Sequence, residues 1–513
     1  MYSESNVKGE KLTNFGKFGL KTIPDYLKYY AEKLKENEAF VFASGERKFW
    51  DVVSWKMLYE NSFSTAMSLV QIGVKERELV AVNLRTCPEW LYITFGAMMA
   101  GAIPVPIAFV YEDGSDIIEV MKRLEKCSTL VMDPGWDGEN LKIIKRLVNS
   151  CNDSGEVECE QMPYLRNLIV HDPANIEPQF KCRRLDDLVN ETDNEIKLPP
   201  IDEDEIAVLL QTSGSTGIAK LVAHTHKSLL LTCLFQDCGW FTPENVYFND
   251  PHSRGLEDCP CLVSLVRNVL AGEDDPHWRS ATNKKYSVKY WKCLQISMLR
   301  LRATEFILMS SMVVDDPEQF TEYACGRVVA GPGLEVKIVD DNEQIVPVNT
   351  GGEIYIRSPC MFKGYFNDKV RTDRVKSKDG WYRTGDLGKM NEDGFFYIDG
   401  RKSNIIISGG INVLPEVMEP VIKACPGIES VVVVPVPDDV SYQLLCVSIV
   451  PKPGSGLTAA QVQTFCEGLH NDRKGVFTVL PKFYLLFAKF PETRTGKTSR
   501  IELARIAAAS VKG

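Results

Sequence analysis

The sequence lacks an excess of positive charge, an internal repeat and any low-complexity tract. Its 513 residues carry 59 Lys and Arg against 69 Asp and Glu, which gives a formal net charge of −10. Because binding to a nucleic-acid backbone requires a basic face, we expect no nucleic-acid partner. Hydrophobic residues make up 44% of the chain. This composition excludes wholesale disorder and fibrous assembly, and the length predicts about two to four folded units.

The chain also lacks paired cysteines and targeting patterns. Its 15 cysteines are scattered and odd in number, and none forms a Cys-x-x-Cys motif. The first residues show neither an apolar signal region nor an Arg-rich amphipathic pattern, and the last three are Val-Lys-Gly rather than Ser-Lys-Leu. We therefore expect reduced thiols and, by default, a cytoplasmic location. Oligomeric state stays open.

One uncharged stretch, residues 90–111, is long enough to span a bilayer. Gly96, Gly101, Pro104 and Pro106 interrupt it. We therefore predict a buried helix over 89–100 that ends at Gly101, followed by a strand over 102–107, and no transmembrane segment.

The first half of the chain alternates helix and strand patterns. Apolar residues at helical spacing over 59–70 precede Gly73, and an apolar strand is predicted over 79–84. Such alternation predicts an α/β fold with a largely parallel sheet. The polar, proline-containing residues 171–205 are interpreted as a connection, and a short strand is predicted over 206–211.

Short strands and Asp-Gly turns dominate from residue 331 onward. Strands are predicted over 334–339, 353–356 and 395–398. After Gly400, a helix over 415–423, a strand over 431–436 and a helix over 458–470 predict a small separate α/β unit.

A loop rich in glycine and hydroxyl groups follows the strand predicted over 206–211. It consists of Thr212, Ser213, Gly214, Ser215, Thr216 and Gly217, and continues to Lys220. Glycines let backbone N–H groups approach a polyphosphate, and a lysine adds a point charge. It is not a Walker A loop, because the lysine stands apart from the second glycine. A surface loop without a ligand is the alternative, but the position directly after a buried strand disfavours it.

This loop resembles the phosphate-binding signature of the adenylate-forming acyl/aryl-CoA synthetase superfamily, which includes medium-chain acyl-CoA ligases, 4-coumarate-CoA ligases and luciferases. Further blocks follow in the family's order, at residues 352–366, 380–386, 399–419 and 491–500. The ordered set is far more specific than any single block. The resemblance implies a large N-terminal adenylation domain of layered α/β subdomains over 1–399, and a small C-terminal α/β lid domain over 400–513.

The resemblance also assigns the phosphate and metal side of a site. Thr212 to Thr216, with Lys220, would hold the β- and γ-phosphates of ATP. Thr304 would touch the α-phosphate, and Glu305 together with Thr216 would hold Mg²⁺. Gly214 and Gly217 would let the loop approach the phosphates closely.

Three further residues receive roles from the same resemblance. Asp386 would accept hydrogen bonds from the ribose hydroxyls, a task that suits a carboxylate because charge-assisted bonds are strong. Arg401 would contact the ribose or a phosphate, and a hinge would lie near Ser403. Lys497 would be the catalytic lysine of adenylation, placing a cation between the attacking carboxylate and the α-phosphate. The block at 352–366 is interpreted as mainly structural.

The activity implied is ATP-dependent activation of a carboxylic acid, fatty or aryl, to acyl-AMP and then to acyl-CoA. Pyrophosphate and AMP would be released, and coenzyme A would be the co-substrate. One alternative is another fate of the adenylate, either transfer to a carrier thiol or oxidation of the luciferase type. A second alternative is a catalytically impaired relative or mis-spliced product that acts at most as a binding protein.

Residues 251–302 interrupt the resemblance. They contain nine Lys and Arg against five Asp and Glu in an otherwise acidic chain, and of the family's Tyr-Gly-x-Thr-Glu motif only Thr304-Glu305 follows. A genuine deletion or a translated frameshift or mis-spliced exon would each explain this. Cys259 and Cys261 with a nearby histidine lack standard zinc spacing, so we predict no metal site there. The acid pocket would be lined from this interval, so the substrate is not predicted.

Overall fold

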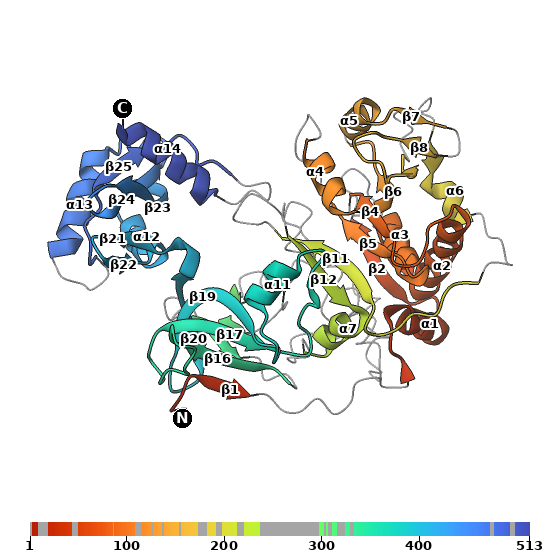
Figure 1. Cartoon of the computed structure of the whole chain (residues 1–513), viewed down its shortest axis with the longest axis horizontal. Coiled ribbons are helices and arrows are strands. Elements are labelled where there is room, and N and C mark those ends of the chain that lie inside the picture. Colours follow the sequence, from red (N-terminus) through yellow and green to blue (C-terminus); the bar gives the residue numbers. More distant parts are fainter. Residues whose placement is uncertain are drawn as a thin grey trace.

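The computed structural model describes residues 3–8, 19–43, 50–85, 87–107, 115–125, 127–135, 138–152, 155–172, 182–190, 197–212, 220–235, 297–301, 304–305, 310–314, 324–328, 333–471, 477–492 and 498–512. Figure 1 shows a large N-terminal part with several sheets and a small C-terminal part, in blue, with a sheet of its own. The predicted fold class, α/β with a large and a small part, is confirmed.

A five-stranded parallel sheet forms the core of the first 190 residues. Its strands, in the order β10-β9-β6-β4-β5, are Arg183–Arg184, Asn167–Val170, Cys127–Met132, Leu79–Asn83 and Ile103–Pro106. Its pairs are parallel, as the alternating sequence pattern predicts. Of these five strands β4 comes first in the chain, and it lies between β5 and β6 in the sheet. The winding therefore reverses between β4 and β6, and ligands of such sheets bind at the carboxyl ends of strands near this point.

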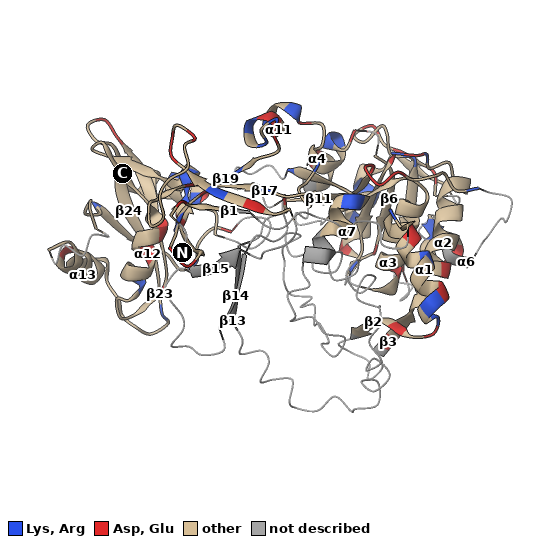
Figure 2. Ribbon diagram, turned by 90° about the horizontal axis from the view of Figure 1, so that it is seen from below, with Lys and Arg blue, Asp and Glu red and all other residues tan. Residues whose placement is uncertain are grey.

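Helices cover this sheet. They are α1 (Ile23–Leu34), α2 (Trp55–Gln71), α3 (Pro88–Met99), α4 (Ser115–Arg123), α5 (Glu139–Leu147) and α6 (Leu185–Asn190). Figure 2 shows acidic and basic residues interspersed along α1 and α2. The helices α2 and α3 pack closely, since a Cβ on Gly96 would lie 2.9 Å from the Ser62 carbonyl oxygen. Residues 90–107 thus form a buried helix and strand. Among the described residues, no helix combines the length and hydrophobicity needed to cross a membrane.

One expectation about the sheets needs correction. The segment 171–205, interpreted as connection, contains β10 and α6, whose two and six residues are too short to show a period. The parallel pattern of the first half does not extend to the second half of the N-terminal part. There an eight-stranded sheet has only antiparallel pairs among the described residues, and short turns such as the one at Gly394 join neighbouring strands, as the Asp-Gly turns predict.

The eight-stranded sheet carries the strands that matter for the site. In the order β1-β16-β17-β19-β20-β15-β14-β13, they are Asn6–Lys8, Glu335–Val339, Gly352–Arg357, Tyr382–Met390, Phe395–Arg401, Ala324–Val328, Ser310–Val314 and Ser297–Leu301. The helix α11 (Lys369–Val375) lies beside β19. The strands predicted at 334–339, 353–356 and 395–398 are confirmed as β16, β17 and β20. The pairing of the N-terminal β1 with β16 joins residues far apart in the chain.

A small three-stranded sheet links the two larger ones. It consists of β11 (Ile206–Gln211), β12 (Leu221–Thr225) and β18 (Gly364–Tyr365), and the helix α7 (His226–Phe235) follows β12. The strands β11 and β12 are antiparallel, and the Thr212 N–H donates to the Lys220 carbonyl at 2.9 Å. The loop predicted to bind phosphate therefore connects a hairpin, and its residues 213–219 lie outside the described part of the chain. Two further small hairpins are formed by β2 (Glu38–Ala43) with β3 (Trp50–Ser54), and by β7 (Ser150–Cys151) with β8 (Val157–Glu158).

The C-terminal part follows β20 through a short 3-10 helix at Lys402–Asn404. Its sheet contains β22 (Ile411–Val413), β21 (Ile406–Ser408), β24 (Tyr442–Pro451), β23 (Ile428–Asp438) and β25 (Phe483–Leu486). The helices α12 (Pro415–Lys423), α13 (Ala459–Asn471) and α14 (Arg500–Lys512) pack against it. Val433, Val447 and Ile449 are fully buried within this part. It thus has its own core, and the elements predicted over 415–423, 431–436 and 458–470 are confirmed.

Candidate nucleotide-binding site

A cleft of about 280 Å³ lies where the three-stranded sheet meets the strands β19 and β20. Charged and phenolic side chains dominate its lining, which comprises Lys220, Glu305, Glu353, Tyr365, Arg374, Val375, Tyr382, Arg383, Thr384, Gly385, Asp386 and Arg401. Four of the residues assigned by the sequence resemblance, Lys220, Glu305, Asp386 and Arg401, therefore share one cleft.

Asp386 and Arg401 form the strand side of this cleft. They are register partners on β19 and β20, and the Arg401 Nε lies 2.5 Å from an oxygen of Asp386. Gly385, at φ +73°, turns the chain just before Asp386. The backbone N–H of Asp386 donates to the Thr384 hydroxyl at 2.9 Å. Burial raises the pKa of Asp386 to about 6, although Arg401 opposes the shift. The carboxylate is thus buried and supported by one cation.

Lys220 and Glu305 lie on the opposite side, with Tyr365 between them. The Tyr365 hydroxyl donates to Glu305 Oε1 at 2.7 Å, and the Lys220 ammonium lies 3.4 Å from the same hydroxyl oxygen. Burial lowers the pKa of Lys220, while the charge of Glu305 opposes the change. Burial and the nearby Glu305 also raise the pKa of Tyr365, so the phenol stays protonated and serves as a donor. The lysine and the carboxylate are held apart, and each keeps hydrogen-bonding capacity for a ligand.

The Thr304-Glu305 pair is fixed through its backbone. The Phe362 N–H donates to the Glu305 carbonyl at 2.9 Å. A ring nitrogen of His224, Nε2, lies 2.7 Å from the Thr304 carbonyl. Complete burial lowers the pKa of His224 to about 4, so the ring is neutral at pH 7. Nε2 then carries the proton and donates to Thr304, while Nδ1 accepts from the Ser228 hydroxyl at 3.2 Å.

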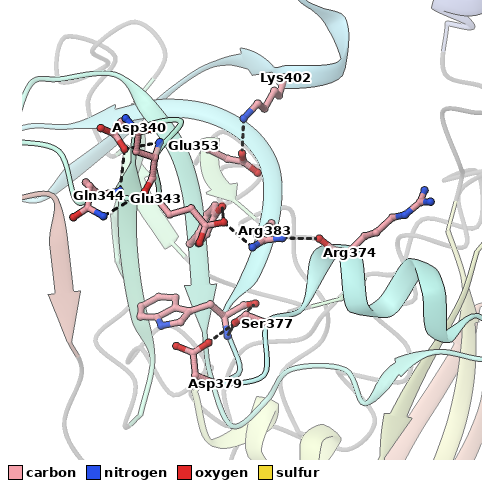
Figure 3. Close-up of polar contacts among 12 residues, drawn as sticks. Asp340, Glu343, Gln344, Glu353, Arg374, Ser377, Asp379, Arg383 and Lys402 are labelled. Carbon is pink, nitrogen blue, oxygen red and sulfur yellow. Dashed lines mark hydrogen bonds and ion pairs between the residues drawn. The ribbon is translucent and has the colours of Figure 1, made fainter.

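Two further cations near the cleft, Arg383 and Lys402, already have carboxylate partners. Figure 3 shows that Arg383 donates to a Glu343 oxygen at 2.6 Å and to the Arg374 carbonyl at 3.1 Å. Lys402 donates to a Glu353 oxygen at 3.0 Å. These bonds tie β17, β19 and the start of the C-terminal part together. Arg374 also lines the cleft, beside Lys220 and Arg401, the two cations that the sequence resemblance assigns to the site.

The arrangement suits a ligand that presents both hydroxyl groups and negative charge. A buried carboxylate accepts from paired hydroxyls, and the two cations attract phosphate oxygens. The Glu305 carboxylate, whose second oxygen is not used by Tyr365, is a hard oxygen donor of the type Mg²⁺ prefers. The site thus fits a nucleotide with its metal ion.

The predicted site residues divide into those the structure places and those it does not describe. Lys220, Glu305, Asp386 and Arg401 line the cleft, Thr304 adjoins Glu305, and Thr212 closes the base of the loop. Ser213, Gly214, Ser215, Thr216, Gly217 and Lys497 lie outside the described residues.

Sequence reasoning missed several residues that line the cleft. Among them, Tyr365 contacts two of the assigned site residues. It belongs to the block at 352–366 that was interpreted as mainly structural, yet its hydroxyl bridges Lys220 and Glu305. The one signal in the sequence was a tyrosine near the end of a glycine-containing block that accompanies the phosphate loop in the family's order. It could have suggested a role for Tyr365 in the site.

The fold and the cleft define an α/β protein with a large and a small part and a charged cleft that ends at Arg401, next to their junction. The family model described as AMP-binding enzyme matches residues 27–250 and 303–366, and the AMP-binding enzyme C-terminal domain matches residues 417–497. The first match covers more than half of the chain, so the chain belongs to the AMP-binding enzyme family. It leaves out residues 251–302, which also break the sequence pattern.

Individual relatives agree with this membership. The chain is 24% identical over 498 residues to a 2,3-dihydroxybenzoate-AMP ligase of Bacillus subtilis, covering 87% of each chain. It is 34% identical over 190 residues to a mitochondrial medium-chain acyl-CoA ligase, ACSF2, of Bos taurus, covering 37% of this chain and 30% of the relative. Neither of these two is named as a non-catalytic binding protein.

A solved structure supports the fold. ATP-bound MatB from Rhodopseudomonas palustris superimposes with a TM-score of 0.73 at 20% identity, over 95% of this chain and 99% of that one. At this identity the likeness bears on the fold alone.

Proposed function

We propose that the protein activates a carboxylic acid with ATP, forming acyl-AMP and pyrophosphate, and then transfers the acyl group to coenzyme A. The observation that carries the proposal is the meeting of Lys220, Glu305, Asp386 and Arg401 in one cleft. Family membership supports acid activation by ATP, and the names of the relatives support an AMP-forming ligase.

In the first step a carboxylate oxygen attacks the α-phosphorus of ATP. A new bond forms between that oxygen and phosphorus, the bond to the β-phosphate breaks, and pyrophosphate leaves. Lys220 and the loop from Thr212 to Thr216 hold the β- and γ-phosphates, and Thr304 touches the α-phosphate. The Lys497 ammonium offsets negative charge that develops between the carboxylate and the α-phosphate.

Two further parts of the site act on the nucleotide. Asp386 accepts hydrogen bonds from the ribose hydroxyls, and Arg401 contacts the ribose or a phosphate. Glu305 and Thr216 would hold Mg²⁺, which would neutralise charge on the phosphates. Positioning and electrostatic stabilisation supply the catalysis, because phosphoryl-group chemistry asks little covalent work of the protein.

In the second step the sulfur of coenzyme A attacks the acyl carbon. The thioester bond forms, AMP leaves with the bonding electrons, and the thiol proton passes to solvent. We propose that residues 400–513 act as a lid for this step and residues 1–399 as the adenylation domain. The strand β20 ends at Arg401, and a three-residue 3-10 helix that contains Ser403 leads into the C-terminal part. This short connection supports a hinge at Ser403. The acid is fatty or aryl, in line with the names of the relatives.

A coupled assay tests the proposal. Purified protein with ATP, Mg²⁺ and a panel of fatty and aryl acids should release pyrophosphate, and loss of coenzyme A thiol should follow with equal stoichiometry. Pyrophosphate release without thiol consumption would indicate another fate of the adenylate. No release with any acid of the panel would contradict acid activation.

A further inference from the structure

Cys87, Glu89 and His171 meet at the carboxyl edge of the parallel sheet, away from the nucleotide cleft. Cys87 precedes α3 just after β4, and His171 directly follows β9. One potential ligand atom from each of the three side chains lies within 4.8 Å of the other two. None of the three residues lines the nucleotide cleft. The carboxyl ends of the strands thus gather a thiol, a carboxylate and an imidazole from distant parts of the chain.

The imidazole of His171 is buried between two carboxylates. The residue is 8% exposed. Its Nε2 lies 3.6 Å from a Glu89 oxygen, and its Nδ1 lies 3.5 Å from an Asp186 oxygen. Nδ1 is nevertheless a buried polar atom without a hydrogen bond. A metal-binding histidine commonly turns one ring nitrogen to the metal and the other to a carboxylate, and Asp186 is near enough to Nδ1 to take the second role once a metal binds at Nε2.

The thiol of Cys87 interacts with the Glu89 carboxylate and is a poor helix cap. Cys87 is the N-cap residue of α3, but its side chain makes no capping hydrogen bond. Serine, threonine, aspartate or asparagine would satisfy that position better. Burial, followed by the nearby Glu89, raises the pKa of the Cys87 thiol to about 12 in the metal-free protein, which excludes a poised nucleophile.

We propose that Cys87, Glu89 and His171 bind a divalent transition metal, with Zn²⁺ as the best fit. Tetrahedral zinc with sulfur, nitrogen and oxygen ligands requires ligand atoms roughly 3.3–3.7 Å apart. The Glu89 to His171 distance of 3.6 Å already satisfies this, and the other separations, which are at most 4.8 Å, need side-chain shifts of no more than about 1 Å. Water takes the fourth position. A thiolate and an imidazole disfavour Mg²⁺ and Ca²⁺.

The consequence for the fold is a brace between three elements. The metal joins the start of α3 to the end of β9, and Asp186, on α6, lies 3.5 Å from the second ring nitrogen of His171. The brace is independent of acid activation, so the site exists whether or not the proposed reaction occurs.

Cobalt substitution tests the site directly. Protein stripped with a chelator is titrated with Co²⁺, and a thiolate-to-cobalt charge-transfer band is followed in the near ultraviolet. We expect a saturable band in the wild type that disappears in Cys87→Ser. Serine improves the N-cap, so this variant stays folded, which a thermal melt verifies. Cys151→Ser, which changes another partly exposed cysteine, is the matched control and should keep the band.

Two further measurements sharpen the result. Asp186→Asn should weaken Zn²⁺ binding by about tenfold, the effect typical of an outer partner of a metal-bound histidine. Zn²⁺ should raise the melting temperature of the wild type and leave that of Cys87→Ser unchanged. A missing cobalt band in the wild type, or a band of equal strength in Cys87→Ser, would overturn the proposal.

Discussion

The nucleotide cleft and the interval 251–302 both belong to the N-terminal part of the chain, yet they keep the family pattern to very different degrees. In the cleft, short blocks place Lys220, Glu305, Asp386 and Arg401 side by side. The interval lies outside the family match, which resumes at residue 303. The difference teaches that short, separate sequence blocks are enough to assemble this cleft, whereas the acid pocket expected from residues 251–302 stays a prediction. We call the cleft residues, the loop from Thr212 to Gly217 and Lys497 the nucleotide half of the site, and the expected acid pocket the other half. Our predictions concern the nucleotide half first.

Lys497→Ala should have the largest effect. Removal of the cation proposed to offset transition-state charge should slow acid-dependent pyrophosphate release by roughly 10²–10³-fold. Lys489→Ala is a suitable control, because this exposed lysine pairs only with Glu492, at 2.9 Å, among the described residues. Unchanged pyrophosphate release in Lys497→Ala would show that the nucleotide half works by another mechanism.

Glu305→Gln should have the next largest effect. Glutamine keeps an acceptor for the Tyr365 hydroxyl but removes the charge proposed to hold Mg²⁺. We expect the Mg²⁺ concentration for half-maximal activity to rise about tenfold or more, since loss of a charged ligand costs at least ~1.4 kcal/mol. Glu335→Gln, which disturbs an ion pair with Arg357 elsewhere on the sheet, should leave the Mg²⁺ dependence unchanged.

Asp386→Asn should weaken ATP binding by about tenfold while stabilising the ligand-free protein. The pKa of Asp386 is raised to about 6 by burial, so the folded protein holds this proton more tightly than the unfolded chain does. The resulting cost to stability is absent below pH ~4, grows between pH ~4 and 6, and is complete above pH 6, where it amounts to about 3 kcal/mol.

Thermal melts and ATP titrations over pH 4–8 check this prediction. The variant should melt above the wild type at pH 8, and the gain should vanish toward pH 4. ATP binding by the wild type should weaken as the pH falls through 6, because the protonated carboxyl accepts poorly. The variant serves as the control for titration of ATP itself. Equal pH profiles in both proteins would exclude Asp386 as the ribose acceptor.

Replacing residues 251–302 by the corresponding stretch of a family member should have the smallest effect on the nucleotide half. ATP affinity should change less than about threefold, which corresponds to under ~0.7 kcal/mol, whereas acid-dependent turnover should change strongly. A large loss of ATP affinity would show that the two halves are not separable. Sequencing the transcript across codons 245–310 distinguishes a genuine segment from a frameshift or mis-spliced exon.

Much of the fold was predictable where local patterns are long. The expected strand at 206–211 and the helix at 415–423 match β11 and α12. The two-residue β10 and the pairing of β1 with β16 were not predictable, because short strands have no period and their partners are distant. The parallel pattern of the first half did not extend to the sheet around β19, whose strands follow tight turns.

The candidate site was predictable where one block supplies one role. Asp386 and Arg401 lie in separate blocks, yet their pairing follows once β19 and β20 form a hairpin. The sequence did not predict that Tyr365 bridges two site residues or that Cys87 lies near His171, because both depend on contacts between distant segments. Lys497 and the loop residues 213–217 lie outside the described part, so their roles stay predictions.

Oxygen-18 transfer tests the central claim most directly. The carboxylic acid is labelled in both carboxyl oxygens and incubated with the protein, ATP, Mg²⁺ and coenzyme A, and the products are examined by mass spectrometry. Attack of the carboxylate on the α-phosphorus predicts one labelled oxygen in AMP and none in pyrophosphate. Unlabelled AMP, or label appearing in inorganic phosphate with formation of ADP, would contradict the account.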